Sequence, residues 1–390
     1  MPETGQIDPE ETGSLALFSR RVVLADREVA ATVVVEDGLI TAIEAESQRP
    51  GALDLGEDIL IPGLVELHTD HLEPHYAPRP KVYWDPLSAV FAYDAQIAAS
   101  GITTVFDSLR VGRDDDRFSV SNALLDLSEA IEAAKRTGLL RADHHTHLRC
   151  EIPSRGVVEE AESYLARFDV RLMSLMDHTP GQRQFRDEEK LRTYYRGKTG
   201  LSETDLDALF DSRRARAAEI GEPNKRGLVA LAHKGGIALA SHDDTIEDHV
   251  AESVADRVSI AEFPTTVEAA RASHSAGIAV LMGAPNVVRG GSHSGNVSAV
   301  ELAEAGVLDI LSSDYVPISL IQGAFGLQDV PAMGGLPGAI QTVTLKPALA
   351  TGMTDRGEIA VGKRGDLVRV ALVGQKPVVR EVWRLGRRVA

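Results

Sequence analysis

The chain has 390 residues and an ordinary composition, 43% hydrophobic and 25% charged, which suits one large folded domain with a smaller one beside it. Its formal net charge of −17 argues against nucleic acids and anionic membranes as partners, and no apolar run is long enough to cross a bilayer. The same charge would repel an anionic substrate at long range. Such a substrate would therefore need a local group of arginines, lysines and backbone N–H donors.

The two ends of the chain differ in pattern from its middle. Residues 1–13 are acidic, which fits neither a signal nor a transit peptide and indicates a short disordered tail. Residues 14–58 alternate as strands do, with a hairpin turn at "EDG", and residues 356–390 show the same pattern. We therefore expect one composite small β domain, a sandwich built from both termini. The single cysteine, Cys150, cannot form an internal disulfide and fits a reducing cytoplasm.

Residues 59–355 alternate short apolar runs with amphipathic stretches. Eight runs are typical of buried strands: "ILIPGLVEL", "GITTVFDSL", "ADHHTHLRC", "VRLMSLM", "GIALAS", "VSIAEF", "IAVLMGA" and "VLDILSS". A strand–helix alternation of this length predicts a (β/α)8 barrel of the TIM type, an α/β fold, with a doubly wound open sheet as the alternative. The longest interruption, near residues 181–224, is charged and helical and could close over the barrel mouth as a lid.

Side chains that can bind metal stand where the predicted strands end. In a barrel of this kind the working residues lie at the carboxyl-terminal strand ends, so these side chains converge on one face. Imidazoles and carboxylates gathered there suit a divalent cation of the zinc, manganese or iron type. One histidine alone is more often a satisfied core or surface residue, but the joint pattern favours a metal site. The residues are His68, Asp70, His145, His147, Glu151, Asp177, His178, His242, Asp243, Asp244, Glu262 and Asp314.

The first strand end carries His68 and Asp70 in a His-x-Asp pattern. Side chains two residues apart on a strand point to the same face, so both can reach one metal ion. The alternative is that Asp70 caps the turn that follows. His71 and His75 lie beyond the strand, and we expect them to be loop or substrate-contacting residues.

The loop after the seventh predicted strand, residues 286–306, combines glycines with hydrogen-bond donors. A helix follows at once, and helix N-termini favour anions. Many barrels bind phosphate at this position, so the loop is the expected local positive patch, with a flexible Gly/Ser loop as the alternative. The expected substrate-binding residues are Arg289, Ser292, His293 and Asn296, and Arg79, Lys81, Arg183 and Gln184 could reach the same ligand.

Several stretches carry a resemblance to a known family. "LIPGLVELHTD", "ASGITTV", "LSSDY" and "GEIAVGKRGDLV" resemble the amidohydrolase superfamily over essentially the whole chain. That resemblance implies a metal-dependent hydrolase on a (β/α)8 barrel with a small β domain from both termini. "PRPKVYWDP", "HLRCE", "SLMDHTPGQRQF" and "LMGAPNVVRGGSHSGN" are narrower in distribution and resemble a diphosphatase branch of the carbon–phosphorus lyase pathway. This narrower resemblance implies hydrolysis of α-D-ribose 1-methylphosphonate 5-triphosphate, a phosphoanhydride, to 5-phosphoribosyl 1-methylphosphonate and diphosphate.

The resemblance also implies the roles of particular residues. It places the catalytic proton acceptor on Asp314. It places the metal ligands on His68, Asp70, Glu151, His178, His242 and Asp314. Two departures from the common superfamily pattern leave open whether one or two ions bind: an aspartate replaces the second histidine of the first strand, and no lysine follows the fourth. Asp70 makes the site richer in oxygen, which suits manganese somewhat better than imidazoles alone would; zinc is the other expected metal.

Two competing functions stay open. One is an amide hydrolase or deaminase of the same superfamily, whose pocket should be poor in anion donors. The other is a non-catalytic scaffold on the same barrel, which should have lost the metal-ligand types that this chain keeps. The sequence does not determine the oligomeric state, so a homo-oligomer stays open as well.

Overall fold

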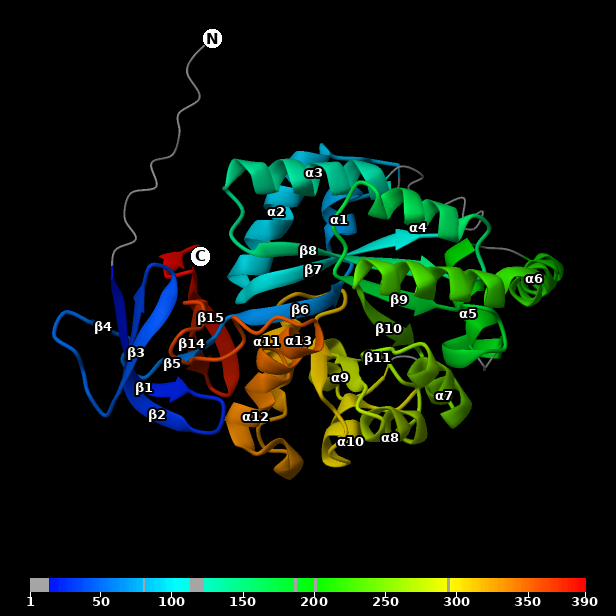
Figure 1. The fold of residues 1–390 in the computed structure, drawn as a ribbon. Helices are drawn as coiled ribbons and strands as arrows, with labels where there is room; N and C mark the ends of the chain where they lie inside the picture. Colours follow the sequence, from blue (N-terminus) through cyan, green and yellow to red (C-terminus); the bar gives the residue numbers. More distant parts are fainter. Residues whose placement is uncertain (1–13, 80, 113–122, 186–187, 200–201, 293–294) are drawn as a thin grey trace, which may run out of the picture.

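The computed structural model describes residues 14–390 except for 80, 113–122, 186–187, 200–201 and 293–294, so the tail predicted at residues 1–13 lies outside the described residues. The described chain forms two eight-stranded sheets (Figure 1). One is parallel and surrounded by helices, and the other, which we call the terminal sheet, is mostly antiparallel and is built from both ends of the chain. No helix in these described ranges is long and apolar enough to span a membrane.

The parallel sheet is the predicted barrel. Its strands lie side by side in chain order. A parallel bridge between Thr69 and Asp314 joins the first strand to the segment after the last, and the Asp314 N–H donates to the His68 carbonyl at 3.1 Å. The doubly wound alternative is wrong, because its strand order would reverse within the sheet. The strands are β6 (Leu64–Thr69), β7 (Ile102–Val111), β8 (Asp143–Glu151), β9 (Leu172–Met176), β10 (Ala238–His242), β11 (Ile260–Glu262), β12 (Ala279–Gly283) and β13 (Ile310–Ser312).

Helices cover the outside of the barrel. α2 shows how the sequence sets a helix start, because Pro86 occupies the first turn and the Asp85 carboxylate accepts a hydrogen bond from the Ser88 N–H at 2.7 Å. The described helices are α1 (Leu72–Tyr76), α2 (Pro86–Ala99), α3 (Ala123–Thr137), α4 (Val157–Leu165), α5 (Glu188–Thr199), α6 (Glu203–Gly235), α7 (Glu247–Ala255), α8 (Val267–Ser275), α9 (Ala284–Arg289), α10 (Ala299–Glu304), α11 (Ser319–Gly326), α12 (Gly335–Gln341) and α13 (Leu345–Ala350), with 3-10 turns at Arg183–Phe185 and Pro331–Met333.

Two layers of apolar side chains hold the barrel together. Val65, Leu67 and Phe106 belong to the cluster that fills the interior, because alternate residues of a strand point inward. Val105, one residue before Phe106, belongs instead to the larger cluster between strands and helices, together with Tyr93 of α2. The interior is therefore packed, and the carboxyl-terminal ends of the strands are left as the place for a site.

The terminal sheet curls around a core of its own. Its order is β16-β15-β14-β5-β1-β2-β3, with β4 paired to β1. Ile40 on β3 and Trp383 on β15 come from opposite ends of this order yet lie in one buried cluster. The predicted hairpin is confirmed at Asp37 and Gly38, whose positive φ angles of 50° and 81° suit a tight two-residue turn. The strands are β1 (Leu15–Val23), β2 (Glu28–Glu36), β3 (Leu39–Ala45), β4 (Leu53–Asp54), β5 (Ile59–Pro62), β14 (Leu367–Val373), β15 (Lys376–Arg384) and β16 (Arg387–Arg388).

One predicted strand is divided between the two sheets. The run of residues 59–67 has the pattern of a single strand, but β5 pairs with β14 and β1, whereas β6 pairs with β7. Gly63 stands between β5 and β6. A Cβ there would lie 2.2 Å from Thr103 Oγ1, so only glycine lets the chain pass this close to β7. β5 therefore belongs with the terminal strands, and the parallel sheet begins at Leu64.

The charged insertion is helical where the structure describes it. α5 and α6 occupy it, and α6 begins where the Ser202 hydroxyl accepts a hydrogen bond from the Asp205 N–H at 3.2 Å. α6 continues past residue 224 to Gly235, and its Leu228 and Ala232 pack in the main core. The insertion is thus continuous with the helix that connects β9 to β10. Its action as a lid stays a prediction.

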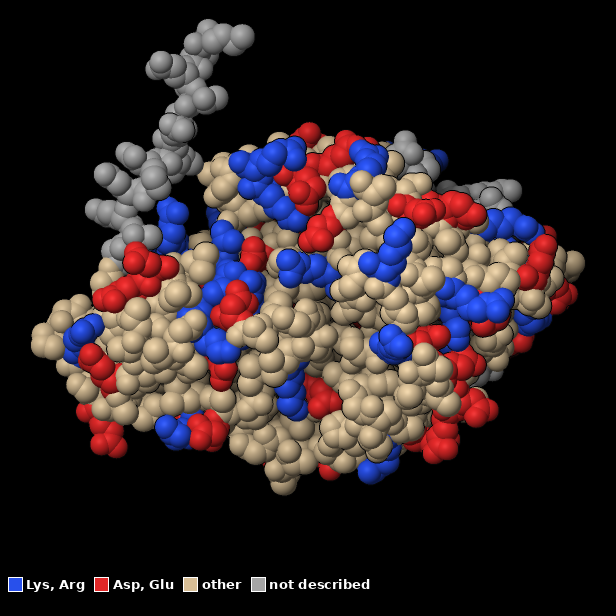
Figure 2. Space-filling view, viewed as in Figure 1, with Lys and Arg blue, Asp and Glu red and all other residues tan. Residues whose placement is uncertain are grey.

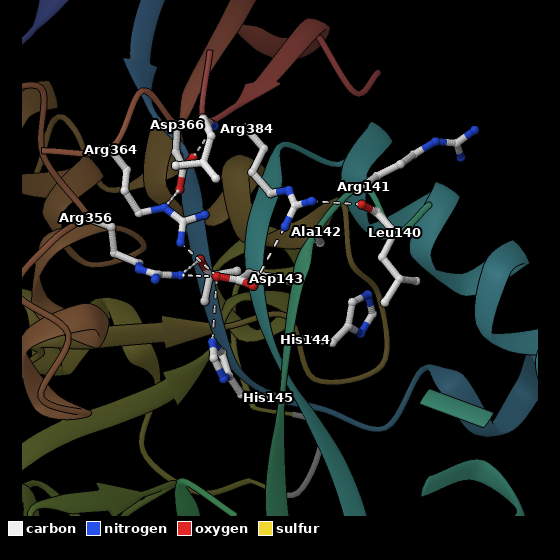
Figure 3. A network of polar contacts seen from close by, with 12 residues as sticks. Leu140, Arg141, Ala142, Asp143, His144, His145, Arg356, Arg364, Asp366 and Arg384 are labelled. Atoms are coloured by element: carbon white, nitrogen blue, oxygen red, sulfur yellow. Dashed lines mark hydrogen bonds and ion pairs between the residues drawn. The ribbon is translucent and has the colours of Figure 1, made fainter. Parts of the chain in front are cut away.

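Asp143 joins the barrel to the terminal sheet (Figure 3). It opens β8, and its Oδ2 accepts hydrogen bonds from Arg356 Nη1 at 2.8 Å and from Arg364 Nη1 at 2.9 Å. Arg384 Nη1 on β15 lies 3.7 Å from its Oδ1. Burial alone would raise the pKa of this carboxyl, but Arg356 and Arg364 outweigh burial and hold the pKa well below its ordinary value. Figure 2 shows basic side chains gathered where the terminal sheet meets the barrel.

Candidate metal centre

The barrel brings histidines and carboxylates from the ends of several strands to one end. β8 shows how the sequence does this, because alternate residues of a strand point to the same side. His147, Arg149 and Glu151 therefore share the inward face of β8. His147 is fully buried and Glu151 is 4% exposed, so neither side chain is a surface residue.

Three buried residues form what we call the inner cluster: His68, His147 and Glu262, whose ligand atoms lie within 4.8 Å of one another. His68 Nδ1 is 3.0 Å and His147 Nε2 is 3.7 Å from Glu262 Oε1. Glu262 Oε2 accepts a hydrogen bond from the Ser174 hydroxyl at 2.7 Å. His147 Nε2 lies against the oxygen of the same hydroxyl. His147 Nδ1 donates to the Leu67 carbonyl at 2.9 Å. Both ring nitrogens of His147 therefore have partners inside the protein.

Burial and the charges of neighbouring side chains set the pKa values in the inner cluster. Burial alone would raise the pKa of Glu262, but the neighbouring His68 and His147 outweigh burial and hold the pKa well below its ordinary value. Burial lowers the pKa of His147 to about 3, against the attraction of Glu262. The inner cluster thus pairs a neutral His147 with an ionised Glu262.

A second group, which we call the outer cluster, consists of His178, His242 and Asp243, whose ligand atoms also lie within 4.8 Å of one another. Glu151 stands at its edge, because its Oε2 lies 2.6 Å from His178 Nδ1 and its Oε1 accepts from the His178 N–H at 3.0 Å. Arg110 Nη2 donates to the same Oε2 at 2.8 Å. Burial alone would raise the pKa of Glu151, but His178 and Arg110 outweigh it and lower the pKa well below its ordinary value.

The two clusters meet at His242. Its ring centroid lies 5.9 Å from that of His68 and 5.6 Å from that of His178. Phe263 packs edge-on against His68 and His242, at 4.9 and 5.4 Å between ring centroids. His242 Nδ1 has an ion-pair contact with Asp243 Oδ2 at 2.9 Å, yet neither buried ring nitrogen of His242 makes a hydrogen bond within the described residues. A buried imidazole in this state, among other imidazoles and carboxylates, fits a divalent metal ion.

Three residues beside the clusters have left-handed backbone. Asp243, Phe263 and Asp314 have φ angles of 59°, 54° and 55°, and each follows a barrel strand by one or two residues. Such angles are unfavourable for side chains other than glycine, and they concentrate at functional sites. The backbone just after β10, β11 and β13 therefore adopts costly conformations next to the two clusters.

Asp314 is held at the seam where the barrel closes. Besides the bond from its N–H to the His68 carbonyl, its own carbonyl accepts a hydrogen bond from the Thr69 hydroxyl at 2.9 Å. Its carboxylate lies toward Gly283, because a Cβ built on that glycine would be 3.8 Å from Asp314 Oδ2 and 3.8 Å from the Phe263 ring. The backbone of Asp314 is thus fixed next to the inner cluster, and both its carboxylate and the Phe263 ring lie close to Gly283.

Glu66 ties this seam together, and the sequence analysis did not single it out. It is fully buried, its Oε1 accepts from the His68 N–H at 2.6 Å, and its Oε2 accepts from the Ser313 N–H at 2.5 Å. Burial raises its pKa to about 8. An acidic residue inside the apolar run "GLVEL" was the signal that could have identified it. Glu66 therefore fixes the backbone of His68 and of Ser313, the residue before Asp314.

Asp70 belongs to neither cluster. It follows β6, its side chain is 41% exposed, and its Oδ2 lies 3.7 Å from Arg149 Nη1. His71 and His75 lie further along, and both contact the Gln96 side chain, at 3.1 and 2.9 Å. Asp70 as a metal ligand stays a prediction.

The predicted substrate-binding residues lie in three places. Arg183 donates to Asp244 Oδ1 at 2.6 Å and to the His242 carbonyl at 3.0 Å, and half-buried Gln184 follows it. Arg289 is exposed at the end of α9, with its Nη1 3.5 Å from the Tyr315 hydroxyl. Arg79 and Lys81 are exposed in the loop after α1.

The remaining predicted residues lie in the loop after β12. The Asn296 N–H donates to the Ser292 hydroxyl at 3.3 Å, and His293 lies outside the described residues. At the start of α10 the Ala299 N–H donates to Asn286 Oδ1, and the Glu301 N–H donates to the Ser298 hydroxyl, both at 3.0 Å. These N–H groups already have partners, which weakens the expectation that this helix N-terminus receives an anion.

Comparison with known proteins identifies the family. The chain is 46% identical over 371 residues to alpha-D-ribose 1-methylphosphonate 5-triphosphate diphosphatase of Escherichia coli (strain K12), and the match covers 95% of this chain and 98% of that protein. This chain belongs to that diphosphatase family. A scan against protein-family models gives no match. The narrower resemblance seen in the sequence is thereby confirmed over nearly the whole chain.

Solved structures share the fold. N-acetyl-D-glucosamine-6-phosphate deacetylase from Mycobacterium smegmatis matches with a TM-score of 0.64 at 14% identity, covering 97% of this chain and 100% of that one. 5-Methylcytosine deaminase from Klebsiella pneumoniae matches with a TM-score of 0.63 at 15% identity, covering 97% and 98%. Molinate hydrolase matches with a TM-score of 0.62 at 16% identity, covering 96% and 94%. Because the sequence identities are this low, these matches establish the fold alone. The fold confirms the predicted amidohydrolase-type barrel.

Proposed function

We propose that this chain hydrolyses α-D-ribose 1-methylphosphonate 5-triphosphate to 5-phosphoribosyl 1-methylphosphonate and diphosphate, with the help of a divalent metal ion. The observation that carries the proposal is the outer cluster, in which buried His242 lacks hydrogen bonds within the described residues and stands between His178 and Asp243. The name of the Escherichia coli relative, at 46% identity, supports the choice of substrate.

The outer cluster would hold the metal, with Glu151 and His68 at its edges and Asp70 as a further predicted ligand. Imidazoles and carboxylates in this mixture suit Zn²⁺ or Mn²⁺. Two adjacent clusters are compatible with either one or two ions for each chain. A bound divalent ion lowers the pKa of a water molecule and polarises a phosphoryl oxygen.

Asp314 is the proposed proton acceptor. Its backbone bonds to His68 and Thr69 hold it at the barrel mouth, and its carboxylate lies close to Gly283 at the end of β12. When water attacks phosphorus, one proton passes to the Asp314 carboxylate. The P–O bond of the anhydride breaks, and diphosphate leaves with the electron pair of that bond.

Arginines and polar loop residues would hold the phosphate chain. Arg289 is exposed at the end of α9, and Ser292 and Asn296 follow it in the same loop. Arg183 would act indirectly, because its guanidinium is already bonded to Asp244 and to the His242 carbonyl. His293, Gln184, Arg79 and Lys81 are further proposed contacts.

The competing functions fit the described geometry less well. An amide hydrolase or deaminase would not need the basic residues found around the mouth, such as Arg110 and Arg289. A non-catalytic scaffold would not need to keep His178, His242 and Asp314 together. Neither alternative accounts for the combination of metal-ligand types and cations at one end of the barrel.

The test is phosphorus NMR of the purified protein with the ribose 5-triphosphate substrate and Zn²⁺ or Mn²⁺. We expect the signals of diphosphate and of a phosphomonoester to appear together. Performing the reaction in ¹⁸O-labelled water would place the isotope on whichever phosphorus is attacked. Release of orthophosphate alone, or no turnover with either metal, would refute the proposal; protein treated with a chelator is the control.

A further inference from the structure

Arg149 is a buried cation at the candidate metal centre that has no role in the proposed hydrolysis. It lies on β8 between His147 and Glu151, on the same inward face of the strand. Only 16% of its side chain is exposed. Its charge acts on both clusters. Burial chiefly lowers the pKa of His147, and Arg149 adds to this effect. Burial also acts to lower the pKa of His242, but Asp243 and Glu262 together outweigh it and raise the pKa, and Arg149 opposes this rise.

The donors of Arg149 are poorly satisfied. Its Nε is buried and has no hydrogen-bond partner among the described residues. Its Nη1 lies 3.7 Å from Asp70 Oδ2, which is an ion pair but is longer than a hydrogen bond. A guanidinium offers five N–H donors, and leaving them unpaired in a buried place costs free energy.

The neighbouring arginines, unlike Arg149, donate short hydrogen bonds to carboxylates. Arg110 donates to Glu151 at 2.8 Å, and Arg183 donates to Asp244 at 2.6 Å. Both guanidinium groups therefore have a carboxylate at hydrogen-bond distance before any substrate arrives. Within the part of the chain that the structure describes, Arg149 has only the distant Asp70 as a carboxylate partner. It can therefore accept an anion without first breaking a short hydrogen bond to a carboxylate.

The negative charge of the site also favours a cation that is free to bind phosphate. Glu151, Glu262, Asp243 and Asp314 place four carboxylates around the two clusters, on a chain whose net charge is −17. A triphosphate entering this site meets repulsion unless positive groups stand close to its path. A planar guanidinium can also give two parallel hydrogen bonds to phosphate oxygens, which a lysine cannot.

We propose that Arg149 binds the phosphate oxygens at the scissile anhydride, and that Asp70 holds its guanidinium in place before substrate arrives. This inference rests on the proposed function and names the residue that recognises the phosphate nearest the metal centre. In the bound state the guanidinium exchanges its ion pair with Asp70 for hydrogen bonds to phosphate. Diphosphate, the product, should bind the same donors.

The experiment measures binding of inorganic diphosphate to the metal-loaded protein by titration calorimetry, so it does not depend on turnover. Arg149→Gln keeps the length of the side chain without its charge and should weaken binding by about ten- to a hundredfold. Arg149→Lys keeps the charge without the fork and should fall between Arg149→Gln and wild type. Arg171→Gln is the matched control. It removes a positive charge at the other end of the barrel, where Arg171 pairs with exposed Asp169 at 3.5 Å, and it should bind diphosphate as wild type does.

The metal content of each variant is measured alongside binding. Weakened binding at an unchanged metal content supports the proposal. Four results would each overturn it. The first two are wild-type affinity in Arg149→Gln and an equal loss of affinity in Arg149→Gln and Arg171→Gln. The other two are a loss of metal together with affinity in Arg149→Gln and no binding of diphosphate by the wild type. If Arg149→Gln does not fold, Arg149→Lys decides, because unchanged affinity in that variant contradicts a role for the planar fork. A wild type that binds diphosphate but releases none from substrate would refute the proposed function alone.

Discussion

His147 and His242 lie in adjacent clusters but differ in the hydrogen bonds of their ring nitrogens. His147 has hydrogen-bond partners for both ring nitrogens, the Leu67 carbonyl and the Ser174 hydroxyl. Neither ring nitrogen of buried His242 makes a hydrogen bond within the described chain, where its Nδ1 has an ion-pair contact with Asp243. Since a buried polar atom without a partner costs about 1–3 kcal/mol, His242 gains most from a bound metal ion. We therefore expect metal binding to depend more on the residues of the outer cluster than on His147.

His242→Ala should lose bound metal while the fold survives. Metal that binds only the folded state raises the melting temperature, so chelation should lower the Tm of wild type by several degrees. The variant should show little response to the chelator. Elemental analysis and thermal melts give the two readouts. His274→Ala, which removes an exposed imidazole paired with Asp309, is the control. A variant with full metal content would show that His242 is not a ligand.

Asp314→Asn should lower kcat by roughly a hundredfold or more, the usual scale for loss of a general base. Asparagine is the suitable substitution because, like aspartate, it tolerates the left-handed φ of 55° found here. The backbone bonds to His68 and Thr69 do not involve the side chain, so the Tm should stay near that of wild type. Near-normal kcat in a folded variant would assign the proton transfer to another group.

At the scale of elements, the segment after β12 carries Arg289, an exposed residue among the proposed phosphate contacts. α9 ends at Arg289, and glycines with positive φ follow at Gly290 and Gly291. These conformations let the backbone turn away from the helix and leave the Arg289 side chain exposed near Tyr315. We therefore expect Arg289 to contact the far end of a phosphate chain rather than the phosphate nearest the sugar.

Arg289→Ala should therefore weaken inhibition by triphosphate analogues more than inhibition by ribose 5-phosphate. One charge-assisted contact is worth roughly 1.5–3 kcal/mol, so the expected loss in kcat/KM is about ten- to a hundredfold. Inhibition constants for mono-, di- and triphosphate analogues on wild type and variant give the comparison. Equal losses for all three would place Arg289 at the first phosphate, and no loss would remove it from the site.

Another element-scale feature is the polar attachment of α2 to the barrel. His144 on β8 lies between Asp107 Oδ2 on β7, at 2.9 Å, and Asp94 Oδ1 on α2, at 3.2 Å. Asp94 also accepts hydrogen bonds from the N–H groups of Arg141 and Ala142, all at 3.0 Å. Burial alone would lower the pKa of His144, but the two carboxylates outweigh it and raise the pKa to about 9. His144 is thus a buried cation between two anions.

This arrangement predicts a pH dependence of stability. The pKa of His144 is raised above its value in the unfolded chain. Its contribution is therefore fully present below about pH 6.5 and is lost as pH rises through about 9, on the order of 3 kcal/mol at most. The difference in free energy of unfolding between wild type and His144→Asn should shrink between these limits. Urea unfolding of metal-free protein tests this, with the exposed His233→Asn as control. A difference that stays constant with pH would contradict the charged state assigned to His144.

At the scale of the whole molecule, the two sheets meet around Asp143. Arg356 and Arg364 come from the segment that leads into β14, and Arg384 lies on β15, so one aspartate of the barrel contacts two parts of the terminal sheet's chain. Figure 3 shows these side chains converging on the start of β8. The terminal sheet should therefore unfold together with the barrel.

Asp143→Asn should weaken this coupling. Breaking a buried ion pair costs several kcal/mol, and partial exposure of Asp143 reduces the expected loss to roughly 2 kcal/mol. Trp383 is buried in the terminal core, so in a Trp84→Phe background its fluorescence reports on that sheet alone. In urea the fluorescence transition of Asp143→Asn should occur at a lower urea concentration than its circular dichroism transition. In the protein that carries only Trp84→Phe, the two transitions should coincide. The control is Asp169→Asn, which removes the exposed partner of Arg171. Coincident transitions in Asp143→Asn, as in this control, would contradict the coupling.

Much of the fold follows from the sequence alone, because it depends on local patterns. The eight apolar runs appear as β6 to β13, since burial on both faces of a parallel strand requires a continuous apolar segment. His68, Glu151, His178 and His242 could be selected because the ends of parallel strands converge. Each of these residues stands at the end of its own run, and no knowledge of the other runs is needed to select it.

Only the tertiary structure decided how these residues are paired. Glu66 bonds the N–H of Ser313, 247 positions away, because the barrel closes there. Asp143 meets Arg356 because the chain returns from the barrel to the terminal sheet. The pairing of β6, β7 and β8 side by side brings Asp70 to within 3.7 Å of Arg149. A sequence pattern specifies which residue types stand on one face of one strand. It contains no distance between strands that are far apart in the chain, and these pairings, with their charges, depend on such distances.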